Sequence, residues 1–366
     1  MKRIFAALSL TVIFAICSYA RSLNEMELSE IRSLFQEHMD NIEMEGIVLE
    51  GSRSEARVAT LSNDGSLIAV GFGKRISPSP NQPNFTDSQV KIYSAENFEK
   101  VAELTTPENG IPYSMAFSSD KTRLLVGYEE GAILWDLESA LPVSVFLPKN
   151  PTGFDNPPPM RIDACGFSSD EEHALLAGGS VVSIYEVKSK EELTYFRTPW
   201  IKTASYLPSG DIITGHAGVA NDVRVYDSKT GDLKRSFKCR SEIKSVIYES
   251  SGGVAYIAAF NPENHAVVDI YKWDLESDAP SREPLSLVGH KDNVSAVQFM
   301  LSIGSILTSS YDRTTKRWSA ETGELQSTFE LKNALATQHS LAIIENFNPV
   351  VLKMEQSNKS GDDNSE

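Results

Sequence analysis

The sequence predicts an all-β protein in which small antiparallel sheets are repeated along the chain, and two observations lead to this expectation. A triplet with the spacing apolar-x-x-apolar-x-aromatic recurs, and a Trp or Tyr follows each copy at a nearly fixed distance. The predicted outermost strands also end alike, on a Leu or Phe every 40–50 residues, roughly. A repeat of this length made of short strands is typical of a propeller blade, so the expected fold is a closed β-propeller.

The repeated positions can be located residue by residue. The clear copies of the triplet are Ile162-x-x-Cys165-x-Phe167, Ile201-x-x-Ala204-x-Tyr206, Ile243-x-x-Val246-x-Tyr248 and Val294-x-x-Val297-x-Phe299, and the looser ones are Pro112-x-x-Met115-x-Phe117 and Ala56-x-x-Ala59-x-Leu61. The aromatic residues that follow them are Tyr93, Trp135, Tyr185, Tyr226, Trp273 and Trp318. The outer strands are expected to end at Leu104, Phe146, Phe196, Phe237, Leu287 and Phe329.

Each unit is expected to hold four strands joined by tight turns. In the second unit an inner strand closes at residues 115–117, and Ser118-Ser119-Asp120-Lys121 forms the first turn. The remaining strands of this unit are predicted at residues 124–127, 132–135 and 142–146. Short apolar runs separated by turn residues are the pattern that antiparallel strands produce.

Both ends of the chain contribute to the predicted number of blades. Six complete units span about residues 53–329, and strand-like segments remain at residues 47–49, 341–344 and 350–354. A seventh blade built from both termini would close the ring and remove its exposed edges. The alternative is six blades with two appended segments.

The first twenty residues are predicted to be a signal peptide. Lys2 and Arg3 precede an apolar stretch from Ile4 to Ile16, and small residues allow cleavage after Ala20. The alternative is an uncleaved anchor or a buried helix. The mature protein is therefore expected to be secreted or periplasmic, with no membrane insertion after cleavage.

The remaining domain boundaries follow from composition. Residues 21–45 are predicted to form an amphipathic helix and linker, because Leu28, Ile31, Phe35, Met39 and Ile42 follow helical spacing. We expect this helix to dock on the propeller, which spans residues 46–354. Residues 355–366 are polar and acidic, so a disordered tail is expected. A structural role that works through this helix and tail is a further alternative.

The charge balance limits the kinds of partner. The chain has 34 Lys and Arg against 50 Asp and Glu, which gives a net charge of −16. Nucleic-acid affinity rests mainly on basic side chains that neutralise phosphates, so DNA and RNA are not expected partners. We expect a monomer. Cys165 lies in an apolar position of the third unit, and a packed free thiol is predicted there.

The sixth unit carries the residues that permit a family comparison. Gly289-His290 is followed by Thr308, Asp312 and Trp318, and Trp-Asp pairs occur at Trp135-Asp136 and Trp273-Asp274. In these features the chain resembles the WD-repeat β-propellers, over roughly residues 46–354. The resemblance implies a hydrogen-bonded tetrad of His290, Thr308, Asp312 and Trp318. Only the sixth unit has the full tetrad, so the other blades are expected to depend on apolar packing.

No residue pattern predicts catalysis, a cofactor or a metal site. The six His residues show no metal-ligand spacing, and the Gly-rich segments lack the strand-loop-helix context of phosphate or nucleophile loops. The alternative function is a hydrolase-type or oxidoreductase-type propeller enzyme with its site at the channel mouth. That alternative requires carboxylates or His at the mouth, and only Asp163 qualifies.

Long loops and flanking residues predict a partner-binding face. Residues 73–89, 147–160 and 261–266 are expected to open on one face, and Asn84 in the first of these loops matches a glycosylation sequon. Residues beside the first apolar position of each triplet should surround the mouth of the propeller's central channel on that face. The candidate partner-binding residues are Arg57, Tyr113, Phe154, Arg161, Asp163, Trp200, Lys202 and Lys244.

These residues predict a non-catalytic scaffold outside the cytoplasm that binds a protein or peptide. Arg and aromatic side chains dominate interface hot spots, so an acidic or aromatic peptide is the expected ligand. The alternative for the long loops is that they are tolerated surface insertions. The alternative for the charged residues is that they are scattered and solvated and bind no partner.

Overall fold

The computed structural model describes residues 47–48, 56–75, 85–95, 99–105, 110–148, 161–249, 253–277, 283–300, 304–330 and 352–353. The chain divides into two units, residues 1–43 and 44–366, and every described residue belongs to the second. The predicted signal peptide, N-terminal helix and acidic tail therefore lie outside the described residues. The loop with Asn84 and the segment with Phe154 also lie outside them.

Six four-stranded antiparallel sheets make up most of the second unit, and consecutive strands are neighbours in each sheet. The first sheet holds β2 (Ala56–Leu61), β3 (Leu67–Arg75), β4 (Phe85–Ser94) and β5 (Lys100–Thr105). The second holds β6 (Ser114–Phe117), β7 (Arg123–Gly127), β8 (Ala132–Asp136) and β9 (Leu141–Phe146). The third holds β10 (Ala164–Phe167), β11 (His173–Gly178), β12 (Val181–Glu186) and β13 (Glu192–Arg197).

The other three sheets repeat this order. The fourth sheet holds β14 (Ile201–Tyr206), β15 (Ile212–His216), β16 (Asp222–Tyr226) and β17 (Leu233–Lys238). The fifth holds β18 (Ile243–Tyr248), β19 (Val254–Phe260), β20 (Val268–Asp274) and β21 (Leu285–Leu287). The sixth holds β22 (Val294–Met300), β23 (Ser305–Ser310), β24 (Thr314–Ser319) and β25 (Leu325–Glu330).

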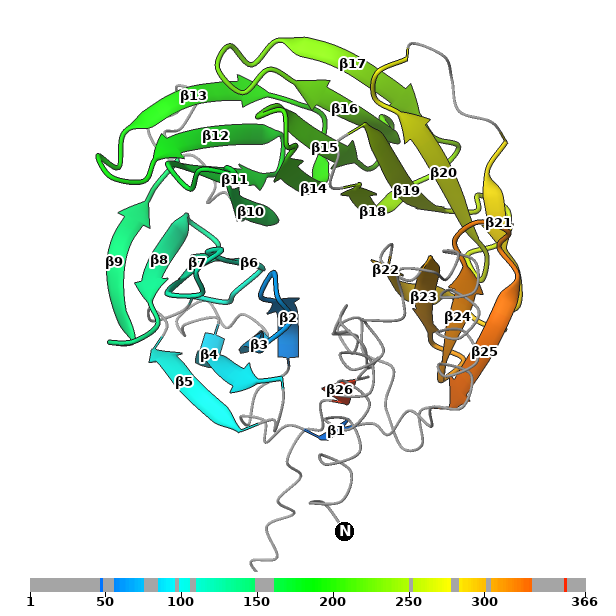
Figure 1. Cartoon of the computed structure of the whole chain (residues 1–366), viewed down its shortest axis with the longest axis horizontal. Helices are drawn as coiled ribbons and strands as arrows, with labels where there is room; N and C mark the ends of the chain where they lie inside the picture. The colour runs from blue at the N-terminus through cyan, green and yellow to red at the C-terminus, as the bar shows by residue number, and fades with distance from the viewer. Residues whose placement is uncertain are drawn as a thin grey trace, which may run out of the picture. The chain divides into compact units, whose positions relative to one another are not determined.

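The first strands of successive sheets contact one another. Contacts join β2 to β6, β6 to β10, β10 to β14, β14 to β18 and β18 to β22. Figure 1 shows the first strand of each sheet innermost and the fourth strand outermost. This arrangement of repeated sheets is a β-propeller, as the sequence predicts.

The prediction of a seventh blade is wrong, because the described residues form six blades. Ile47–Val48 (β1) pairs in parallel with Leu352–Lys353 (β26), so that Ile47 lies opposite Leu352. A blade needs four antiparallel strands joined by hairpins, whereas the residues described outside the six sheets are two two-residue strands that form a parallel pair. The pairing nevertheless joins the segment before the first sheet to the segment after the sixth.

The repeated apolar positions form the core between successive sheets. The first residue of the triplet is fully or almost fully buried in Ile162, Ile201, Ile243 and Val294. The six aromatic residues that follow the triplets, from Tyr93 to Trp318, are all buried as well. Between the second and third sheets, for example, the Phe146 and Tyr185 rings lie 5.3 Å apart. Cys165 and Cys239 are free thiols, as predicted for Cys165.

Candidate partner-binding face

Two kinds of loop lie at the same edge of the sheets: those between the second and third strands, and the connections from one sheet to the next. Ile162 N donates to Tyr128 O at 2.9 Å, Ile201 N to Gly179 O at 2.7 Å, and Val294 N to His265 O at 3.0 Å. Each bond joins the second-to-third-strand loop of one sheet to the start of the next. We call this edge the upper face.

Glycine at the end of a second strand allows this close approach. A Cβ atom at Gly178 would overlap the carbonyl oxygen of Arg161, and one at Gly127 would lie 2.7 Å from a methyl carbon of Ile162. Both contacts are closer than real Cβ atoms tolerate. These glycines therefore fix where the third sheet begins and hold residues 161–163 at the upper face.

A first cluster on the upper face joins the second and third sheets. The Arg161 Cζ atom lies 5.0 Å from the centroid of the Tyr113 ring. Arg161 Nε also donates to Asp163 Oδ1 at 2.6 Å. The guanidinium is held between a ring and a carboxylate, and its side chain remains 46% exposed. This cluster can offer a positioned cation and an aromatic edge to a partner.

A second cluster joins the fourth and fifth sheets. Lys202 Nζ lies 3.2 Å from Glu242 Oε1, and Lys244 Nζ lies 3.9 Å from the same oxygen. Lys244 Nζ also lies 4.0 Å from the centroid of the Phe260 ring, which stacks on His265. Burial lowers the pKa of Lys244, Glu242 opposes this shift, and the Lys202 ammonium adds to it. Two cations therefore share one carboxylate.

Exposed apolar side chains accompany the second cluster. Trp200 precedes β14 and is 54% exposed, an unusual state for the largest apolar side chain. Ala217 N donates to Trp200 O at 3.0 Å, which places the loop of residues 217–221 next to Trp200. Val219 in that loop is 99% exposed. Tyr311 is also exposed in the second-to-third-strand loop of the sixth sheet, and so is Val288 in the connection from the fifth sheet to the sixth.

The structure brings most of the predicted residues to the upper face. Tyr113, Arg161 and Asp163 form the first cluster. Lys202 and Lys244 belong to the second, and Trp200 lies two residues before Lys202. Arg57 lies in β2. Glu242, Phe260 and His265 were not among the predicted residues. Glu242 directly precedes Ile243, so the rule that selected the other residues also points to it.

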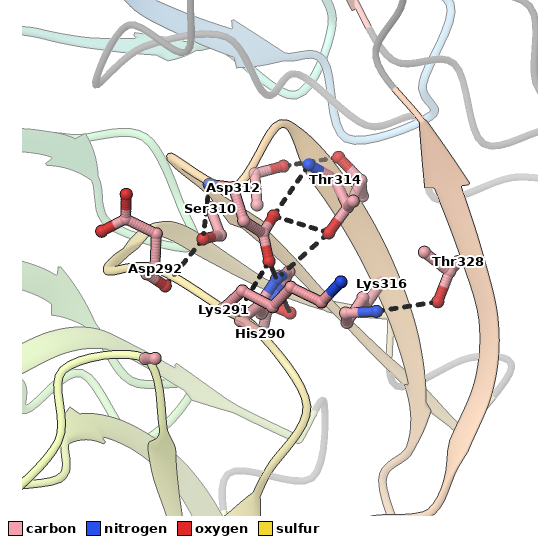
Figure 2. Close-up of polar contacts among 12 residues, drawn as sticks. His290, Lys291, Asp292, Ser310, Asp312, Thr314, Lys316 and Thr328 are labelled. Atoms are coloured by element: carbon pink, nitrogen blue, oxygen red, sulfur yellow. Dashed lines mark hydrogen bonds and ion pairs between the residues drawn. The ribbon is translucent and has the colours of Figure 1, made fainter.

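A polar network in the sixth sheet lies at the same face (Figure 2). His290 Nδ1 lies 2.9 Å from Asp312 Oδ2, and His290 Nε2 lies 2.7 Å from Thr308 Oγ1. Trp318 Nε1 donates to Thr308 Oγ1 at 2.7 Å. The four residues that the family resemblance places in a tetrad are thus joined by hydrogen bonds. The buried indole and imidazole both find partners in this way.

The charges of this network follow from its contacts. Burial opposes ionisation of Asp312, yet the Lys291 N–H, Thr314 and His290 together hold the pKa of its carboxyl at about 2. Burial lowers the pKa of His290, although Asp312 opposes this shift. A neutral His290 donates through Nδ1 to Asp312 and accepts the Thr308 hydroxyl through Nε2. The network therefore fixes the connection from the fifth to the sixth sheet.

The fourth sheet also contains a His–Asp pair, which was not predicted from the sequence. His216 Nδ1 lies 2.9 Å from Asp222 Oδ1, and Arg224 Nε donates to Asp222 Oδ2 at 2.9 Å. His216 is fully buried, and its Nε2 atom has no hydrogen-bond partner among the described residues. Both residues flank the second-to-third-strand loop, so this pair holds the loop beside Trp200.

Among the described residues, no group of three or more His, Cys, Asp or Glu side chains is placed to hold a metal ion. In the same part of the chain, no helix has the length and apolar character needed to cross a membrane.

Comparison with known protein families finds a known repeat within the chain. The model of the WD domain, G-beta repeat, matches residues 282–319. This segment contains β21, the fourth strand of the fifth sheet, and β22 to β24 of the sixth. No curated protein sequence matches the chain. The repeat match and the six-sheet arrangement together support a WD-repeat β-propeller, a fold that is generally a protein-interaction scaffold and typically non-catalytic.

Proposed function

We propose that this protein is a non-catalytic scaffold that binds an acidic protein or peptide segment on its upper face, outside the cytoplasm. The observation that carries the proposal is the position of Trp200. This indole is half-exposed and precedes a strand whose Lys202 forms an ion pair with Glu242. Exposed Trp beside basic side chains is the composition of interface hot spots.

The electrostatics of the second cluster favour an acidic ligand. Lys202 and Lys244 share a single carboxylate, so one positive charge of the group is not balanced by Glu242. A carboxylate from a partner can bind this excess charge while an apolar or aromatic neighbour covers Trp200. The first cluster supplies a third cation on the same face, Arg161, which lies between Tyr113 and Asp163.

Export rests on the sequence of the first twenty residues. A basic start, a short apolar stretch and small residues before Ala20 are the features of a cleavable signal peptide. The scaffold would then meet its partner in the periplasm or in the medium. Amino-terminal sequencing of the purified protein tests this part of the proposal, because a chain that begins at Met1 contradicts cleavage after Ala20.

Affinity capture from extracytoplasmic extracts tests the binding site. The wild-type protein is compared with an Arg161→Glu, Trp200→Ala, Lys202→Glu variant, and with Lys188→Glu as a control. Lys188 is exposed in the turn between β12 and β13, at the opposite edge of the third sheet. We expect wild type and the control to retain the same partner and the triple variant to lose it. Equal retention by a folded triple variant would contradict binding at the upper face.

A further inference from the structure

The loop between β15 and β16, residues 217–221, presents an apolar tip on the upper face. Val219 in this loop is 99% exposed, which among the described residues is the largest exposed fraction of any large apolar side chain. The corresponding loops of the second, fifth and sixth sheets each expose a charged side chain, and that of the third exposes a serine: Glu130, Glu263, Arg313 and Ser180. The loop of the fourth sheet is therefore the one with an apolar tip among the five that the structure describes.

The two ends of this loop are bonded to neighbouring segments. Ala217 N donates to Trp200 O at 3.0 Å, and Cys239 N donates to Asn221 O at 2.9 Å. Val219 follows Ala217 by two Cα-to-Cα steps of about 3.8 Å, which place it within about 8 Å of Ala217. The apolar tip therefore lies near the segment that presents the exposed Trp200 indole.

Lys238 holds the tip of the loop. Its Nζ atom donates to Val219 O at 3.3 Å and also to Ala220 O. Gly218 has a φ of 74°, a conformation that glycine adopts readily and that forms the turn before Val219. Because the backbone is bonded at both ends and at the tip, Val219 stays in water until a partner covers it. Covering an exposed apolar side chain is favourable, so the held loop is suited to binding.

We propose that Val219 and Trp200 bind an apolar side chain of the partner, within four residues of the acidic side chain that Lys202 and Lys244 bind. This inference rests on the proposed function and specifies its ligand as an acidic segment with a nearby aliphatic or aromatic residue. An extended segment rises about 3.3 Å per residue, so four residues span roughly 13 Å. That length covers the 3.0 Å bond from Trp200 to Ala217 and the steps on to Val219.

The nearby charges favour an acidic segment over a second copy or a lipid surface. Lys202 follows Trp200 by two residues, and Lys238 bonds to the loop at Val219, so cations accompany both apolar side chains. A two-fold contact through this region would bring the lysines of two copies together. The net charge of −16 opposes binding to an anionic lipid surface. A partner segment with carboxylates and an apolar side chain meets neither obstacle.

Selection from a random-sequence peptide display library on the full-length protein tests the composition of the ligand. Wild type should enrich peptides with an aliphatic or aromatic residue within four positions of an Asp or Glu, relative to the unselected library. Val219→Ser should still enrich acidic residues but no longer the apolar neighbour. The matched control is Val101→Ser, which changes a 60% exposed valine on β5 and should enrich the same peptides as wild type. Enrichment on Val219→Ser identical to that on wild type overturns the proposal.

A double-mutant cycle separates this inference from the proposed function. The most enriched peptide, and a copy with its apolar residue replaced by Ser, are titrated against wild type, Val219→Ser and Lys202→Glu. We expect either serine change alone to raise the dissociation constant about fivefold or more, and both together to raise it little further. If Val219→Ser binds like wild type while Lys202→Glu binds weakly, this inference is wrong and acidic recognition stands. If no acidic peptide is enriched, both are contradicted.

Iodide quenching of fluorescence locates the bound peptide. Trp135, Trp273 and Trp318 are buried, so Trp200 is the indole of the four that iodide reaches. The bound peptide should protect Trp200 from iodide in wild type and protect it less in Val219→Ser. Quenching that the bound peptide leaves unchanged overturns the assignment of Trp200 and Val219 to the ligand.

The other two occupants are tested without peptide. Wild type and Val219→Ser are compared by sedimentation velocity and by co-sedimentation with phosphatidylglycerol vesicles. We expect both proteins to be monomeric and to remain unbound to the vesicles. Self-association or vesicle binding that Val219→Ser abolishes would overturn the assignment of a peptide to this loop.

Discussion

Lys202 and Glu242 lie on successive sheets and form an ion pair, with Lys202 Nζ 3.2 Å from Glu242 Oε1. Lys244 approaches the same carboxylate from the fifth sheet. Glu242 therefore occupies, within the protein, the place that a partner's carboxylate would take between two ammonium groups. The exposed Trp200 lies two residues before Lys202, so charge and apolar surface are available together.

Removing the Glu242 charge should strengthen the binding of an acidic ligand. In Glu242→Gln the two lysines keep their positions and lose their internal counter-ion. We expect the dissociation constant of an acidic peptide to fall several-fold, with a steeper dependence on salt, because more unpaired positive charge faces the ligand. Isothermal titration at two salt concentrations measures both effects.

The matched control for that prediction is Glu263→Gln. Glu263 is exposed in the second-to-third-strand loop of the fifth sheet, and its charge lies on the same face. A similar gain in both variants would indicate a general charge effect, and weaker binding in Glu242→Gln would contradict the assignment of Glu242 as the internal counter-ion.

The Thr308 hydroxyl should contribute far more to stability than its counterpart in the fourth sheet. Thr308→Val leaves the Trp318 N–H and the His290 Nε2 atom without their partner, at a cost of about 2–4 kcal/mol. Thr214 is equally buried and pairs with Ala204 as Thr308 pairs with Val297. Its hydroxyl makes one longer bond, 3.4 Å to Arg224 O. Thr214→Val should cost about 1 kcal/mol or less.

Urea unfolding of the two threonine variants measures the difference in the free energy of unfolding. Equal losses would mean that the network in the sixth sheet contributes no more than an ordinary buried hydroxyl.

Gly178 should tolerate no side chain. A methyl group there overlaps the Arg161 carbonyl, so Gly178→Ala must shift the start of the third sheet and is expected to cost about 1–3 kcal/mol. The control is Gly166→Ala in β10, where an added Cβ has nothing within 4 Å. That change should alter stability by less than about 1 kcal/mol. Thermal unfolding of both variants checks the prediction, and a stable Gly178→Ala protein would contradict the close contact.

Stability should fall as the pH falls below neutrality. Burial lowers the pKa values of His216 and His290 from 6.5, so below about pH 6.5 the unfolded chain binds protons that the folded chain does not. The contribution of these two His residues to the free energy of unfolding is complete above that pH and declines below it. The Asp312 carboxyl has a pKa of about 2 when folded and 3.8 otherwise, so its contribution is lost as the pH falls through that interval.

The free energy of unfolding measured between pH 8 and pH 4 tests this dependence. In His216→Asn the slope between pH 7 and pH 5 should be smaller than in wild type. The matched control is His173→Asn, which changes a partly exposed His at the start of β11. A wild-type stability that rises as the pH falls from 7 to 5 would contradict the direction of these shifts.

The recurrence of the apolar triplets made the propeller predictable from sequence. Each triplet begins an inner strand at a residue that the packed sheets must bury, such as Ile201 or Ile243, and the aromatic residue two strands later completes the same core. The positions beside Ile162 and Ile201 were predictable for the same reason, because side chains alternate along a strand. The number of blades was not predictable: strand-like segments at both ends do not reveal whether they pair as a blade.

The contacts within the site were less accessible from sequence. Glu242 and Lys202 are far apart in the chain, and their ion pair depends on how two sheets meet. His216 and Asp222 flank a turn at a spacing that matches no familiar motif, so their bond appears only once the strand ends are placed.

Recognition of an acidic peptide segment by the upper face around Trp200 and Lys202 can be measured with peptides selected on the full-length protein from a random-sequence display library. Their dissociation constants are determined for wild type, Trp200→Ala, Lys202→Glu and the Lys188→Glu control. We expect acidic peptides whose affinity falls about 10-fold or more in Trp200→Ala and Lys202→Glu and is unchanged in the control. Selected peptides without acidic residues, or affinities equal in all three variants, would contradict it.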